Sequence, residues 1–241
     1  MPNNVEKMTF NYSPNFDIMK RSNKQIKYLI FHYTGMKNDN LAIKKLTSEK
    51  SKVSCHFYIN KNGELIEIVP ESYIAWHAGK SKWGKDNLLN KNSIGIEISN
   101  PGHEHGYKKF SKKQIECLIK ISRKLIIKYN INKKNVLGHS DIAPLRKKDP
   151  GEKFPWKYLS TKKIGLWHKI NLDNSKKLRE KNINLRMNFF LKQLKKFGYC
   201  TKFSNSNELR KIIKSFQRRF RPELVNGKLD KECLEIIKSL I

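Results

Sequence analysis

The sequence predicts a mixed α/β domain, in which helices flank a central β-sheet, followed by a small C-terminal domain of three helices. Short apolar runs rich in β-branched and aromatic residues recur between residues 26 and 137 and indicate strands. A long segment with helical spacing, 112–129, precedes the last of these runs. Beyond residue 182 the apolar runs have helical spacing, so the tail is predicted to form a separate helical unit.

The N-terminal part is predicted to lead into the first strand. Residues 1–24 are expected to be irregular, because prolines and several asparagines interrupt any hydrophobic period. The first strand is expected at about 26–33, where β-branched and aromatic residues are dense. A short helix is expected after Asn40, because Leu41, Ile43 and Leu46 follow at helical spacing.

The middle of the chain supplies the other predicted strands. Segments 53–59 and 64–69 flank Asn62-Gly63, a dipeptide that strongly favours a two-residue turn, and are predicted to form a hairpin. Isoleucines alternate with small and polar residues over 93–99, which predicts a further strand with Glu97 on the face opposite the isoleucines. The last strand is expected at 135–137.

One long helix is predicted to cover the sheet. Ser111 and Gln114 have the spacing of a capping box, which places the start of the helix directly after Ser111. Its apolar side continues to about Tyr129 at helical spacing and includes Ile115, Leu118, Ile119, Leu125 and Ile126.

The C-terminal third is predicted to divide into a linker and a helical domain. With the lead-in 1–24, the expected domains are 25–168 for the α/β part, 169–182 for a polar linker and 183–241 for the helices. The helical part begins at Leu185 and has breaks at Gly198 and Pro222, which predicts three helices.

Composition narrows the functional classes. The chain has 241 residues, 38% of them hydrophobic, enough for one sizeable core and a small second domain. It carries 51 Lys plus Arg against 21 Asp plus Glu, a formal charge of +30. The lysines are scattered through nearly every segment and are not grouped with aromatic residues, so no specific nucleic-acid site is expected. Loose attraction to anionic polymers is expected from the charge alone.

Three features bear on location. No apolar run approaches the roughly 18 residues of a membrane span, so no transmembrane segment is expected. The first 25 residues contain neither an apolar signal-peptide core nor a cysteine for lipid attachment. The cysteines lack metal-type or close spacing, which fits reduced thiols. These features predict a cytoplasmic protein, with export to the periplasm by an unrecognised route as the alternative.

The candidate site begins with two residues that follow the last strand. His139 comes directly after the apolar run and Gly138, and Asp149 precedes Pro150, which biases its backbone toward an extended form. Pro144 and Pro150 stiffen the segment, so a loop is expected to hold both side chains at a fixed separation. A histidine and an aspartate alone are more often surface polar residues than a metal site.

A third ligand makes a metal site the better interpretation. His32 stands near the end of the first predicted strand, just as His139 follows the last one. Two histidines and one aspartate with an open coordination position form the ligand set of a catalytic zinc ion. Glu97, on the face of its strand that also carries Gly95, is the candidate general base outside the metal ligands.

These segments resemble the zinc-dependent N-acetylmuramoyl-L-alanine amidases, the amidase-2 family, and most closely its AmiD-like branch. The resemblance covers about residues 25–168, with several motifs in the family's order. They are FHYTG (31–35), SCHFYINKNGELIEIVPE (54–71), AWHAG (75–79), NKNSIGIEISN (90–100), and GHSDIAPLRKKDPG (138–151) followed by FPW (154–156).

The resemblance implies an activity and roles for single residues. The family hydrolyses the amide bond between N-acetylmuramic acid, including its 1,6-anhydro form, and L-alanine of peptidoglycan or muropeptides, in cell-wall turnover and recycling. It implies one Zn²⁺ per chain on His32, His139 and Asp149, with Glu97 as the catalytic acid and base. Lys147 is implied to stabilise the oxyanion, a role that the residue pattern alone does not indicate.

Three further side chains are expected to contact substrate. His56 is placed near the site by the resemblance, although a histidine inside a strand is more often a packed core residue. Trp76 is expected to pack on a sugar ring or lactyl group, and His77 to hydrogen-bond a peptide carbonyl. The pattern of a Trp-His pair is equally consistent with ordinary core packing.

The tail resembles peptidoglycan-binding modules of the PG-binding-1 type, through LKKFGY (194–199), FQRRFRP (216–222) and NGKLD (226–230). The alternative is a helical bundle that only stabilises the catalytic domain. For the whole chain, the alternative function is a non-catalytic peptidoglycan-recognition protein on the same fold. The sequence does not indicate an oligomeric state.

Overall fold

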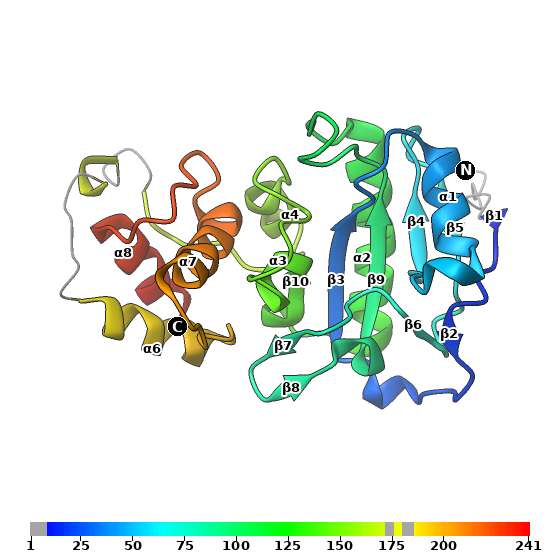
Figure 1. Cartoon of the computed structure of the whole chain (residues 1–241), viewed down its shortest axis with the longest axis horizontal. Coiled ribbons are helices and arrows are strands. Elements are labelled where there is room, and N and C mark those ends of the chain that lie inside the picture. Colours follow the sequence, from blue (N-terminus) through cyan, green and yellow to red (C-terminus); the bar gives the residue numbers. More distant parts are fainter. Residues whose placement is uncertain (1–8, 172–175, 180–185) are drawn as a thin grey trace. The chain divides into compact units, whose positions relative to one another are not determined.

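The computed structural model describes residues 9–171, 176–179 and 186–241, which fold as two compact units (Figure 1). The sheet unit consists of the chain up to Gly79 together with Asn90–Val136. The helical unit consists of Lys80–Leu89 and Leu137–Ile241. The predicted domain boundaries differ from this division, because the segment after the last strand packs with the C-terminal helices.

The sheet is mixed, as predicted. Its strands lie in the order β1-β5-β4-β9-β3-β10. β3 and β4 pair with β9 in parallel, β1 pairs with β5 in parallel, and β4 and β5 form the antiparallel hairpin around Asn62-Gly63. The strand bounds are β1 Thr9–Phe10, β3 Tyr28–Tyr33, β4 Phe57–Ile59, β5 Leu65–Glu67, β9 Ser93–Ile98 and β10 Val136–Gly138. The hairpin strands are therefore shorter than predicted, and His56 lies just before β4.

The register of β3 against β9 divides the sheet into two chemically different faces. Phe31 lies beside Ile96 and Leu29 beside Ile94, so one face is apolar. On the other face His32 lies beside Glu97. Because side chains alternate along a strand, the same pairing that buries the apolar residues places the polar pair together.

The predicted helices of the sheet unit form where their caps indicate. α1 (Asp39–Thr47) begins after Asn38, whose side chain accepts the Leu41 amide, and packs its Ala42 and Leu46 into the core beside the β4-β5 hairpin. α2 (Lys112–Tyr129) has the predicted capping box of Ser111 and Gln114 and packs on β3 and β4.

The lead-in is more ordered than the sequence suggests. β1 extends the sheet, and β2 (Phe16–Asp17) pairs with β6 (Ile74–Ala75), so the prediction of an irregular segment is wrong for the part that is described. The end of the lead-in is also anchored by a buried Arg21, whose guanidinium donates to the carbonyls of Ser93, Asn90 and Glu71 at 2.6–3.2 Å. Residues 1–8 lie outside the described residues.

The helical unit combines the segment after the last strand with the tail. It contains the short pair β7 (Lys82–Trp83) and β8 (Asp86–Asn87), the one-turn helix α3 (His139–Ile142), and α4 (Trp156–Thr161). Three C-terminal helices follow as predicted: α6 (Met187–Phe197), α7 (Ser206–Phe220) and α8 (Lys231–Leu240). α3 packs against α7.

The predicted linker is only partly described. Residues 172–175 and 180–185, which include Leu185, lie outside the described residues. Within the linker, Arg179 forms ion pairs with Glu223 at 2.5 Å and Glu232 at 2.6 Å. Among residues 9–171, 176–179 and 186–241, no helix is both long and apolar enough to cross a membrane. The cytoplasmic location stays a prediction.

Candidate functional site

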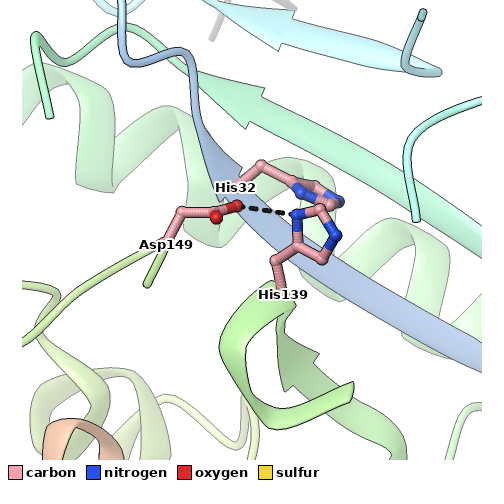
Figure 2. A group of neighbouring side chains, drawn as sticks. All are labelled: His32, His139 and Asp149. Atoms are coloured by element: carbon pink, nitrogen blue, oxygen red, sulfur yellow. Dashed lines mark hydrogen bonds and ion pairs between the residues drawn. The ribbon is translucent and has the colours of Figure 1, made fainter. Parts of the chain in front are cut away.

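Three of the predicted site residues come together. The possible ligand atoms of His32, His139 and Asp149 all lie within 4.8 Å of one another, and all three side chains are buried. Figure 2 shows them converging, His32 from β3, His139 from the start of α3 and Asp149 from the loop that follows. His139 was expected in a loop; it is instead the first residue of a helical turn.

A close contact in this group joins His139 to Asp149. The Nδ1 atom of His139 and the Oδ2 atom of Asp149 are 3.0 Å apart, and the two side chains are nearly inaccessible to water. Two ligands bound to one tetrahedral zinc ion at about 2.0–2.1 Å would be roughly 3.3 Å apart. The pair therefore has a separation that fits two ligands of a single ion.

His32 is oriented by a second histidine. Its Nε2 atom lies 3.0 Å from Nδ1 of His77, whose Nε2 atom lies 3.1 Å from the Ser93 hydroxyl. Ligand histidines commonly donate their other ring N–H to such a partner. When His32 donates from Nε2 to His77, the lone pair of its Nδ1 is free for a metal ion, and His77 then donates to Ser93.

Glycine at position 95 makes this arrangement possible. A Cβ atom there would lie 2.4 Å from Cγ and Nδ1 of the His77 ring. The ring therefore packs directly on the backbone of β9, in space that any other residue would fill. On the face of β9 that Gly95 shares with Glu97, the His77 ring occupies the space above the glycine.

Glu97 lies beside His32 because the two residues are register partners on neighbouring parallel strands. Neighbouring strands are about 4.8 Å apart, and partner side chains project from the same face. Glu97 is half-buried. Burial, and then the nearby Glu97 carboxylate, raise the pKa of the Cys55 thiol well above its usual value.

Two basic residues follow α3. Lys147 is half-buried, and its amide donates to the Ala143 carbonyl at 3.0 Å. Arg146, which the sequence analysis did not single out, donates from Nε and Nη2 to the Lys80 carbonyl at 3.0 and 2.9 Å. Its Nη2 atom is 3.3 Å from Nε2 of His139. Burial lowers the Arg146 pKa, while the charge of Asp149 opposes that shift.

The expected substrate-contacting residues have different surroundings. His56 is fully buried: its Nδ1 accepts the Gly95 amide at 3.0 Å and its Nε2 lies 2.7 Å from the Arg21 guanidinium. Burial, and then the Arg21 charge, hold the His56 pKa well below its usual value. Trp76 is half-buried and donates from its indole N–H to Asp17 at 2.7 Å.

These surroundings leave the substrate roles as predictions. His56 has the hydrogen bonds of a packed core histidine, and the ring nitrogens of His77 face His32 and Ser93. No local pattern identifies Arg146 in the sequence, since it stands in a basic run with Lys147 and Lys148.

A mixed α/β layer that brings two histidines and an aspartate together, with a glutamate in register beside one of them, is an arrangement typical of metal-dependent hydrolases. The chain belongs to the N-acetylmuramoyl-L-alanine amidase family Amidase_2, whose sequence profile matches residues 22–152. The predicted family and fold are confirmed.

Relatives extend the likeness over the C-terminal helices. The chain is 34% identical, over 233 residues, to the N-acetylmuramoyl-L-alanine amidase AmiD of Escherichia coli (strain K12), covering 90% of this chain and 83% of that protein. A solved complex of E. coli AmiD with the substrate anhydro-N-acetylmuramic acid-L-Ala-D-gamma-Glu-L-Lys superposes with a TM-score of 0.79, covering 90% of this chain and 88% of that one. Pseudomonas aeruginosa AmpDh3 in complex with anhydromuramic pentapeptide gives a TM-score of 0.78 at 28% identity, covering 99% and 96%.

Replacing Gly95 by alanine is expected to weaken metal binding. The new Cβ would displace the His77 ring, and His32 would lose the partner that fixes its orientation. Loss of such a partner typically lowers metal affinity roughly 10–100-fold. Competition with a chromogenic chelator, with zinc as the probe, measures the change.

The double variant Gly95→Ala/His77→Ala is the matched control. It removes the ring that the new Cβ would strike, so thermal stability should recover while zinc affinity stays low. Wild-type zinc affinity in the Gly95→Ala protein would show that His77 does not orient His32.

Proposed function

We propose that this chain hydrolyses the amide bond between N-acetylmuramic acid, including its 1,6-anhydro form, and L-alanine in peptidoglycan or muropeptides. The reaction belongs to cell-wall turnover and recycling. The observation that carries the proposal is the buried group of His32, His139 and Asp149, with Glu97 in register beside His32. Family membership and the likeness to E. coli AmiD, which was solved with an anhydro-muropeptide, support it.

The donor set fits one zinc ion. Two imidazoles and a carboxylate, all buried, are the ligand types of catalytic zinc sites, which keep one position open. His77 holds the His32 imidazole in orientation through a hydrogen bond, and His139 Nδ1 and Asp149 Oδ2 have the separation of two ligands on one ion. Bound zinc would act as a Lewis acid toward the amide carbonyl and lower the pKa of the attacking water.

The protein's own groups would move the proton and hold the developing charge. Glu97 takes the proton of the attacking water and passes it to the departing alanine nitrogen, since it lies beside His32 and outside the ligand set. Lys147 stabilises negative charge on the tetrahedral oxygen. Trp76 offers an aromatic face to the sugar or lactyl group. Substrate contacts of His56 and His77 stay predictions, because the nitrogens of both rings already bond within the protein.

The domain proposal assigns the catalytic part to 25–168, the linker to 169–182 and a peptidoglycan-binding module to 183–241. Observed helices α6 to α8 and the extent of the likeness to AmiD and AmpDh3 support a common C-terminal part. The module would raise the effective concentration of the enzyme on polymeric peptidoglycan. A non-catalytic recognition protein is disfavoured, because the three ligands and Glu97 are all present.

Wild-type protein is expected to release the stem peptide from an anhydro-muropeptide, and a chelator should stop the reaction. His139→Ala removes one of three protein ligands and should abolish both bound zinc and cleavage. Mass spectrometry of the products and metal analysis of the purified protein test the two effects. Full zinc occupancy in the His139→Ala protein would overturn the ligand assignment.

Glu97→Gln is expected to separate metal binding from catalysis. The amide keeps the size of the side chain but cannot accept the proton, so the rate should fall at least about 100-fold. Zinc affinity should stay within about twofold of the wild type, since Glu97 is not in the ligand group. If the variant cleaves muropeptides at the wild-type rate, the proton-transfer role belongs to another residue.

The Glu97→Gln protein also tests the C-terminal module without digesting its target. In about 0.3 M salt, which screens the formal charge of +30, it should co-sediment with insoluble peptidoglycan. This binding should persist when excess anhydro-muropeptide saturates the catalytic site. An insoluble polyanion controls for charge. Complete release by the small ligand would mean that the tail supports the fold and binds no glycan.

A further inference from the structure

The tail of the helical unit contacts the one-turn helix that begins with His139. α3 is short, and its four residues are all buried. Two of them, Ser140 and Asp141, bond to side chains that follow residue 198 in the sequence. The contacts lie within one compact unit.

Asp141 is held on both of its carboxylate oxygens. Oδ1 accepts the Tyr199 hydroxyl at 2.5 Å, and Oδ2 accepts the Gly138 amide at 2.8 Å together with Nη1 of Arg219. Asp141, Tyr199 and Arg219 each expose 2% of their surface or less. Burial, and then the Asp141 charge, raise the Tyr199 pKa well above its usual value, so its hydroxyl remains a donor.

Ser140 connects the tail to both prospective ligands of this unit. Its carbonyl accepts the Ser215 hydroxyl of α7 at 2.6 Å, and its amide donates to the Asp149 carbonyl at 2.8 Å. His139 precedes it directly in the chain. A displacement of Ser140 would therefore move the backbone of His139 and Asp149 at once.

Close packing fixes the rest of the arrangement. The Arg219 guanidinium lies over the Trp156 ring, 4.2 Å from its centroid. A Cβ atom at Gly138 would lie 2.6 Å from Cδ of Pro150, so the backbone before His139 touches the residue after Asp149. A buried ion pair contributes little net stability, since desolvation offsets its attraction, but its geometry is demanding.

We propose that Tyr199, Ser215 and Arg219 are positioning residues for His139 and Asp149, so that the tail completes the metal site. The inference rests on the proposed function. It assigns the C-terminal helices a role within catalysis that does not depend on binding peptidoglycan. Misplacing a catalytic group by about 1 Å can lower the rate on the order of 100-fold. Loss of a hydrogen bond that holds α3 in place can therefore affect catalysis strongly.

The test removes single hydroxyl groups from the full-length protein. Tyr199→Phe deletes the bond to Asp141, and Ser215→Ala deletes the bond to Ser140. Neither change leaves an isolated buried charge, because Asp141 keeps Arg219. Each variant should bind zinc about 10-fold more weakly or worse in chelator competition. Its kcat on an anhydro-muropeptide should fall by a similar factor with KM unchanged.

Matched controls carry the same chemical changes away from α3. Tyr158→Phe removes an exposed hydroxyl from α4, and Ser206→Ala removes one from the exposed start of α7. Both should keep wild-type zinc affinity and kcat. Melting temperatures of all four variants show how far each change affects global stability.

The outcomes separate this inference from the proposed reaction. If Tyr199→Phe and Ser215→Ala lower only the melting temperature, with zinc affinity and kcat within twofold of wild type, the tail is merely structural and the inference fails. If wild-type protein binds zinc but cleaves no muropeptide, the proposed reaction fails, and weaker zinc binding by the variants still supports positioning. If the wild type binds no zinc, both fail.

Discussion

The parallel pairing of β3 with β9 positions the core of the sheet and the candidate site at the same time. It sets His32 beside Glu97 on one face while Phe31 and Ile96 fill the core on the other. A shift of one residue in either strand would turn its polar residue into the core and expose its apolar ones. The free energy of burying isoleucine and phenylalanine thus also fixes the position of the proposed metal ligand His32 relative to Glu97, the proposed acid and base.

Burying polar groups beside that sheet requires that their hydrogen bonds be made inside the protein. The rings of His56, His77 and His32 follow one another with centroids 5.5 and 5.1 Å apart, and each bonds to a backbone or side-chain partner. Unpaired, each would lose on the order of 1–3 kcal/mol to desolvation. The same hydrogen bonds also fix the orientations of the rings. One set of contacts therefore both offsets the desolvation of these histidines and orients His32 for its proposed role.

The spacing of residues along the sequence was sufficient to predict the features that depend on the period of a strand or on a helix cap. Alternation along 93–99 placed Glu97 on the polar face, and the capping box at Ser111 located α2. It could not reveal partners distant in sequence: Arg219 and Asp141 are 78 residues apart, and Tyr199 and Asp141 are 58 apart. The structural role of Arg21, within residues 1–24, could not be predicted for the same reason. A single arginine belongs to no repeating pattern in the sequence, and its three carbonyl partners come together only once the sheet has formed.

Buried Arg21 also limits how this sequence can change. Lysine far outnumbers arginine in this sequence. A guanidinium fork can reach the carbonyls of Ser93, Asn90 and Glu71 together, whereas an ammonium group on a flexible stem cannot match that planar geometry. Lysine in place of Arg21 would therefore keep the charge but lose part of this set of hydrogen bonds, so the shape of the side chain matters at this position as well as its charge.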